Sequence, residues 1–177
     1  YTAVLNHVLE VNQQDATVTV QVGVTWQKLH ETLAPLGLTT PFWGTLSGRY
    51  ATVGGGLSQN GIFWGSGYHG AAGDNVLGLK VVTGTGDIIE TGAASQKASA
   101  PFCSYFGPNL TATFIGDCGA FGIKLTATLP LIPAANHKGF ASYAFDNYTD
   151  MTLAMADISR NRLASECFGF DPYLQRQ

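Results

Sequence analysis

The feature that most constrains this chain is its middle region, because most of the 22 glycines lie between Gly44 and Gly92. A flexible linker would combine glycine with serine and would carry few apolar side chains. Here aromatic and aliphatic residues alternate with the glycines, and over residues 41–78 only Arg49 and Asp74 carry a formal charge. The pattern predicts a folded but irregular surface on which the backbone is exposed at chosen points.

The composition excludes several classes of protein. Of the 177 residues, 45% are hydrophobic and 12% are charged, so a sizeable core can form. The net charge of −3 argues against a nucleic-acid-binding protein, which normally carries a basic stripe. We find neither an apolar run of about 18 residues, as a membrane span needs, nor a secretory signal. We therefore expect a cytoplasmic protein, and because the chain starts at Tyr1 rather than at Met, a fragment of a longer one.

Cysteine and histidine give no sign of a metal site. The chain has three cysteines without a CxxC spacing, an odd number that favours reduced thiols over disulfides or a zinc ribbon. The four histidines are too scattered for a site that can be recognised from sequence. We expect no metal ion.

The regions flanking the glycines alternate between apolar and polar residues with the periods of strands and helices. Thr25 is suited to capping a short helix whose apolar face is Trp26, Leu29 and Leu33. The glycine-rich region itself is expected to form loops and short turns. The other predicted elements are a hairpin of residues 5–11 and 17–22, a second hairpin of residues 77–83 and 87–91, and a strand over residues 121–131.

The character of the sequence changes after Pro133, where we place a domain boundary. Residues 1–133 are predicted to form one domain, and residues 134–177 the beginning of a second one. In the second part we expect strands over residues 140–145 and 167–170, and between them a helix capped by Asp146 or Thr149.

Two glycine motifs resemble sequences that bind nucleotides. Residues 65–70 match GxGxxG, but the strand before them is too short, and Gly73 and Gly78 would weaken the helix after them, so we reject a Rossmann site. The run Gly54–Gly56 is a stronger signal, because successive glycines can present backbone N–H groups in a concave nest that binds a phosphate. A tight turn between core segments explains the same run equally well. No P-loop or GxSxG motif occurs.

Four segments in the same order resemble the FAD-binding domain of the vanillyl-alcohol-oxidase/PCMH family of FAD-linked oxidases. The first is the predicted strand pair leading into Gly23-Val24-Thr25-Trp26. The others are residues 41–61, with Thr-Val-Gly-Gly-Gly-Leu-Ser-Gln-Asn-Gly; residues 74–86, with Asp-Asn-Val-Leu-Gly-Leu; and residues 115–126, with Gly-Asp-Cys-Gly-Ala-Phe-Gly-Ile. The resemblance covers residues 1 to about 133.

The resemblance implies an α+β fold: the second subdomain of a PCMH-type FAD-binding domain, with a mainly antiparallel sheet flanked by helices, and the start of an α+β cap domain. It implies FAD as a non-covalent cofactor, since His69 does not match the family's attachment sites. Gly54, Gly55 and Ser58 would follow the pyrophosphate and ribityl chain, residues 41–47 would lie beside the isoalloxazine, and Gly122 with the main chain of Ile123 would hold the far end. The implied cofactor-binding residues are Pro41, Phe42, Trp43, Gly44, Thr45, Ser47, Thr52, Gly54, Gly55, Gly56, Ser58, Asn60, Gly61, Gly119, Gly122 and Ile123.

The function implied by the resemblance is oxidation of a small alcohol or 2-hydroxy acid by hydride transfer to the flavin. No residue is assigned as the catalytic base. The expected partners are this small-molecule substrate and the N-terminal FAD subdomain and C-terminal cap of the same parent chain, and we expect the fragment alone to be inactive. The alternatives are a non-catalytic glycine-rich binding or scaffold module and a flavoenzyme similar to the enolpyruvyl reductases.

Overall fold

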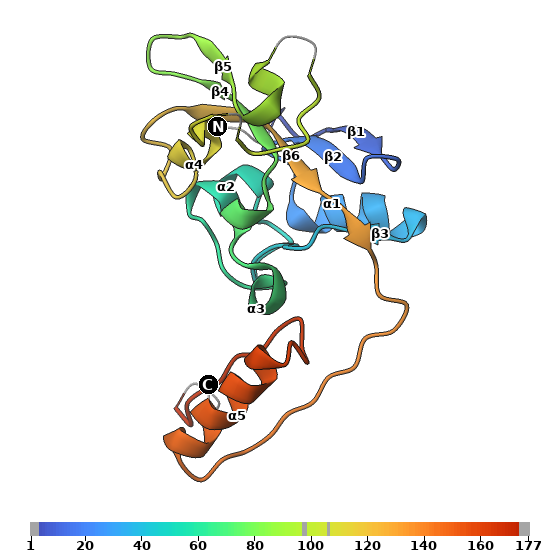
Figure 1. The fold of residues 1–177 in the computed structure, drawn as a ribbon, viewed down its shortest axis with the longest axis vertical. Helices are drawn as coiled ribbons and strands as arrows, with labels where there is room; N and C mark the ends of the chain where they lie inside the picture. The colour runs from blue at the N-terminus through green and yellow to red at the C-terminus, as the bar shows by residue number, and fades with distance from the viewer. Residues whose placement is uncertain (1–3, 97–98, 106, 174–177) are drawn as a thin grey trace.

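The computed structural model describes residues 4–96, 99–105 and 107–173. It has the predicted α+β architecture: an antiparallel sheet in the order β1-β2-β6-β4-β5, with helices packed against it (Figure 1). The strands of this sheet are β1 (Val8–Asn12), β2 (Thr17–Gln21), β4 (Gly78–Val82), β5 (Ile88–Glu90) and β6 (Ile123–Pro130). A second pair joins β3 (Leu38–Thr39) to β7 (Ile132–Pro133).

Both predicted hairpins are confirmed. In the first, Asn12 closes the turn between β1 and β2 by accepting a hydrogen bond from the Asp15 backbone N–H at 2.9 Å. Val18 and Val20 of β2 point into the core, and the threonines between them are half-buried, as the period of two predicts. β6 lies at the centre of the sheet because it pairs with β2 on one side and with β4 on the other.

The predicted first helix is also confirmed as α1 (Trp26–Leu33). Its N-terminus is capped by the Thr25 hydroxyl, which accepts a hydrogen bond from the Lys28 backbone N–H. Trp26, Leu29 and Leu33 are buried on one face and join the core formed by the sheet valines. The helix runs into a 3-10 turn, η2 (Ala34–Leu36), which ends at Gly37 in the left-handed conformation.

The prediction of loops for the glycine-rich region is wrong, because part of it is helical. It contains α2 (Val53–Ser58), α3 (Ser66–His69) and η3 (Ala72–Asn75), joined by turns. The Thr52 hydroxyl accepts a hydrogen bond from the Gly55 backbone N–H at 3.1 Å, so this threonine is the N-cap of α2. The cap and the buried side chains of Val53 and Leu57 outweigh the low helix propensity of three glycines. Beyond β5 lie the short turns η4 (Gly92–Ser95) and α4 (Leu110–Thr113).

The two strands predicted after Pro133 are wrong. Residues 140–145 and 167–170 form no strand, since neither pairs with another segment of the described chain. The predicted helix is present as α5 (Tyr148–Arg160), but its N-cap is Asn147 rather than Asp146 or Thr149. The domain boundary near Ala134 stays a prediction.

The C-terminal segment lies beside α3 after a long extended connection (Figure 1). The backbone N–H of Gly67 donates to the Glu166 carboxylate at 3.2 Å, and the rings of Phe63 and Phe168 lie 5.6 Å apart. None of the residues of α5 is buried. Within the described ranges, none of the helices has the length and hydropathy of a membrane span.

Candidate cofactor site

The triple glycine does not form the open nest of backbone donors that its pattern suggested. The N–H of Gly54 donates to the carbonyl of Val22 at 2.8 Å, and the N–H of Gly56 donates to the carbonyl of Thr52 at 3.0 Å. The N–H of Gly55 donates to the Thr52 hydroxyl. All three donors therefore already have acceptors within the protein, and the nest interpretation is wrong.

Packing explains why glycine occurs at two of these three positions. A Cβ at Gly54 would lie 2.7 Å from the Val22 Cβ, and a Cβ at Gly56 would lie 3.0 Å from the Trp26 indole nitrogen. Helix α2 can therefore approach β2 and α1 this closely only without side chains at Gly54 and Gly56. Of the two interpretations that sequence alone left open, the structure supports a role between core segments, although the run forms part of a capped helix rather than a tight turn.

Unpaired backbone donors occur instead at Thr45, Leu46 and Ser47. Their N–H groups make no hydrogen bond within the described part of the chain. The Leu46 side chain is 71% exposed, and Ser47 is exposed as well. Three successive backbone donors at the surface can bind an anion without a cationic side chain.

These donors lie at one end of a strip of predicted site residues. A Cβ at Gly61 would lie 3.5 Å from the Thr45 methyl group, so Gly61 and the 45–47 segment are neighbours. From there the strip continues to the C-terminal end of α2, where the carbonyl of Ser58 accepts a hydrogen bond from the Cys118 backbone N–H at 2.9 Å. We call residues 45–47, 58–61 and 116–123 the cofactor strip, since they bring together segments far apart in sequence.

A buried ion pair fixes the far end of the cofactor strip. The Lys124 ammonium lies 2.6 Å from a carboxylate oxygen of Asp117, and the two side chains are 3% and 0% exposed. Lys124 also donates to the Ser58 hydroxyl at 2.9 Å, which links β6 to α2. The Asp117 carboxylate accepts hydrogen bonds from the backbone N–H groups of Gly119 and Phe121. The 116–123 loop is thus held by one cluster of charges.

The cluster keeps Asp117 ionised. Burial alone would raise the pKa of Asp117, but the hydrogen bonds from Lys124 and from two backbone N–H groups, with the lysine charge, hold the pKa below its ordinary value of 3.8. The lysine charge is consequently neutralised within the protein, and it is not available to a ligand as a free cation.

Several predicted residues, one of which belongs to the cofactor strip, have structural roles. Phe42 is 1% exposed in the core, and Thr52 serves as a helix cap. Gly122 leaves room for β4, because a Cβ there would lie 2.5 Å from a Val81 methyl group. Pro41 and Gly44 are buried, and Trp43 is half-buried. No observation tests whether the predicted residues bind FAD, so that assignment stays a prediction.

Sequence reasoning missed Lys124 and Asp117. A signal for them existed, because Lys124 is the one charged residue of a central strand and needs a buried partner, and an acidic residue lies on the loop just before that strand. The described residues contain no group of three or more His, Cys, Asp or Glu side chains that could hold a metal ion.

The residues of the cofactor strip fit FAD. The open N–H groups of residues 45–47 suit the negatively charged diphosphate, and they need no cation. The exposed apolar side chains of Phe121 and Ile123, which are 60% and 61% exposed, offer surface to flat rings.

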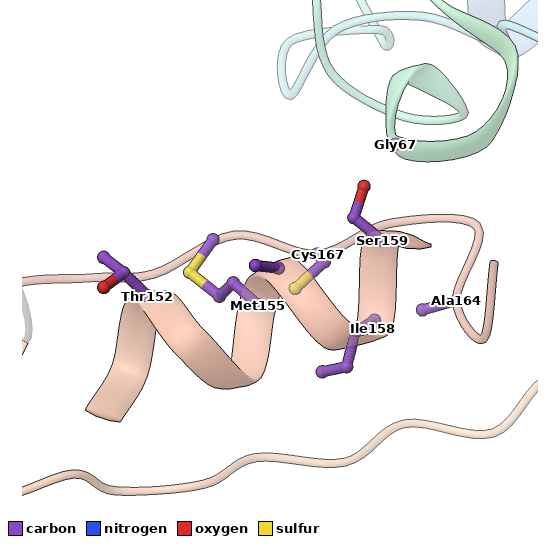
Figure 2. Close-up of a pocket in the computed structure, with 8 residues that line it drawn as sticks. Gly67, Thr152, Met155, Ile158, Ser159, Ala164 and Cys167 are labelled. Atoms are coloured by element: carbon purple, nitrogen blue, oxygen red, sulfur yellow. The ribbon is translucent and has the colours of Figure 1, made fainter. Parts of the chain in front are cut away.

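A cavity away from the cofactor strip is a poorer candidate. It measures about 360 Å³ and lies between α5, the Cys167 segment and Gly67 (Figure 2). Met155 and Ile158 contribute apolar walls, and the Ser159 hydroxyl is directed towards α3 (Figure 2). None of its lining residues carries a formal charge, so it offers a phosphate only the hydroxyls of Thr152 and Ser159.

Comparison with known proteins identifies the family of the chain. Residues 2–92 match the family described as FAD binding domain. The chain is 30% identical over 154 residues to a glycolate oxidase subunit of Bacillus subtilis, with 87% of this chain and 31% of the relative covered. It is 26% identical over 157 residues to the mitochondrial D-lactate dehydrogenase (cytochrome) 1 of Saccharomyces cerevisiae, covering 89% and 25%.

A solved structure shows the same fold. An alkyldihydroxyacetonephosphate synthase superposes with a TM-score of 0.61 at 23% identity, over 75% of this chain and 21% of the other. The chain spans about a third or less of the length of the curated relatives named above. The match over residues 2–92 confirms the resemblance found in the sequence: the chain belongs to the FAD binding domain family, of the PCMH type, and FAD is its cofactor.

Proposed function

We propose that this chain is the cofactor-holding part of an FAD-dependent oxidoreductase that oxidises a 2-hydroxy acid. Glycolate and D-lactate, which the names of the two relatives specify, are both 2-hydroxy acids. The observation that carries the proposal is the cofactor strip, where unpaired backbone donors and exposed apolar side chains lie on segments that contact one another.

In this proposal, the residues of the chain bind the cofactor and orient it. The N–H groups of Thr45, Leu46 and Ser47 bind the diphosphate, and the Lys124–Asp117 pair keeps the 116–123 loop in one conformation. When bound, FAD accepts a hydride from the carbon that carries the substrate hydroxyl. The fixed loop geometry lowers the entropic cost of binding, because the groups that touch the cofactor are ordered before it arrives.

The proposal is tested by following flavin absorbance in the longest natural form of the protein. We expect bound flavin whose visible bands bleach without oxygen when glycolate or D-lactate is added. The bleaching should not occur with acetate or propionate, which lack the hydroxyl. A protein that holds no flavin, or holds flavin that no 2-hydroxy acid reduces, would contradict the proposal.

A further inference from the structure

A second, smaller cavity of about 170 Å³ lies between α1, the 43–49 segment and Trp64. All three tryptophans of the chain line it. The rings of Trp43 and Trp64 stack at 5.4 Å with 12° between their planes, and His30 stacks on Trp43 at 5.8 Å. An apolar cavity of about 150 Å³ is known to accept benzene. The cavity therefore has the volume and the flat walls for one six-membered ring.

Two residues that line this cavity each have a buried polar atom without a partner among the described residues, Trp26 Nε1 and His30 Nδ1. The Nδ1 atom of His30 is buried, and it makes no hydrogen bond within the described part of the chain. A buried polar atom that leaves water without gaining a hydrogen bond destabilises the fold. His30 also lines the cavity, so a ligand there can supply the missing hydrogen bond once the imidazole ring turns to bring Nδ1 to the cavity wall.

The charged residues near the cavity determine whether an anion or a cation binds there. Arg49 lines the cavity and forms no ion pair among the described residues, although its guanidinium lies 5.9 Å from the Tyr50 ring centroid. The Lys138 ammonium lies 5.2 Å from the Trp43 ring centroid. No carboxylate belongs to the lining. Tryptophan walls alone would attract a cation, but Arg49 is the charged residue of the lining and favours an anion, while the nearby Glu31 carboxylate is already hydrogen-bonded to Gln27 at 2.6 Å.

The geometry points to a site for an aromatic carboxylic acid. The ring lies against the tryptophans, the carboxylate pairs with Arg49, and a hydroxyl on the neighbouring carbon hydrogen-bonds to His30. Thr45 belongs both to the cavity lining and to the cofactor strip, so the acid lies next to the cofactor. The further step, that an aromatic 2-hydroxy acid is the substrate, rests on the proposed function.

The site is tested without flavin, by intrinsic fluorescence, because every tryptophan of the chain is at the cavity. Titration of the purified chain with benzoate should change the emission in a saturable manner. Binding should weaken about tenfold in Arg49→Gln, which loses a charge-assisted hydrogen bond. The matched control is Arg162→Gln: Arg162 also stands over a tyrosine ring, at 5.1 Å from Tyr68, but away from the cavity, and its removal should leave the affinity unchanged.

Three probes that differ from benzoate in charge or in aromaticity test which groups the site recognises. Benzyl alcohol and cyclohexanecarboxylate should bind more weakly than benzoate, and benzylammonium should not bind. The site is refuted if benzoate gives no saturable change, if Arg49→Gln binds it as tightly as the unaltered chain, or if benzylammonium binds as well. If benzoate binds but mandelate does not bleach the flavin of a protein that glycolate does bleach, the site stands and the substrate step fails.

Discussion

Replacing Asp117 by Asn should be among the most destabilising single changes in the cofactor strip. The change keeps the shape of the side chain but leaves the Lys124 ammonium, 3% exposed, without a counter-charge. Removing one partner of a buried ion pair costs about 3–5 kcal/mol. Because the Ser58 hydroxyl and the new amide oxygen can still accept hydrogen bonds, we expect about 3 kcal/mol.

The assay is urea unfolding followed by circular dichroism. A loss of about 3 kcal/mol lowers the midpoint by roughly 1–2 M, with an unchanged slope. The matched control is Asp157→Asn, since Asp157 pairs with Arg160 at 3.2 Å while both are more than two-thirds exposed. That change should cost less than about 1 kcal/mol. Adding Lys124→Met to Asp117→Asn should restore much of the stability, because no buried charge then remains.

The effect of Asp117 also depends on pH in a defined direction. Its pKa is lower in the folded protein than the ordinary 3.8, so its contribution to stability is complete above that value. As the pH falls below 3.8 towards the folded-state pKa, the stability difference between the unaltered chain and Asp117→Asn should shrink. The reasoning is refuted if Asp117→Asn and Asp157→Asn unfold at the same urea concentration at neutral pH.

Two further perturbations follow from the structure. Gly54→Ala should destabilise the fold by about 1–3 kcal/mol in urea unfolding, because its Cβ would meet Val22 at 2.7 Å. The neighbouring Gly55→Ala should have little effect, as its Cβ meets only the end of a side chain; equal losses would contradict the packing argument. Burial and then the charge of Arg162 lower the pKa of His69, so stability should fall as the pH drops below 6.5. His69→Asn should remove that part of the pH dependence. The melting temperatures of both proteins, measured from neutral to mildly acidic pH, test this, and an equal fall in the two would contradict it.

The parts of the fold that the sequence predicted correctly have local causes. The alternation of Val18 and Val20, the cap at Thr25 and the turn after Asn12 each act over a few residues. The failed predictions depended on distant partners. Residues 140–145 have strand-like composition, but a strand forms only against a neighbour, and no described segment supplies one.

In the candidate site, too, the prediction failed where it depended on a partner far away in the sequence. The resemblance selected the segments that the structure brings together, but pattern alone placed the open donors at Gly54–Gly56 rather than at Thr45–Ser47. A run of glycines does not reveal whether its N–H groups face a ligand or a neighbouring strand. The partner of Gly54 is Val22, more than thirty residues earlier, and this contact becomes visible only in three dimensions.

The central claim is that the donors of residues 45–47, and not those of the triple glycine, hold the cofactor. Amide hydrogen exchange with and without saturating FAD tests it most directly, because the two sets of N–H groups differ in their internal hydrogen bonds. The account predicts new protection at Thr45, Leu46 and Ser47, with no change at Gly54–Gly56. Protection that appears at Gly54–Gly56 while residues 45–47 still exchange freely would contradict it.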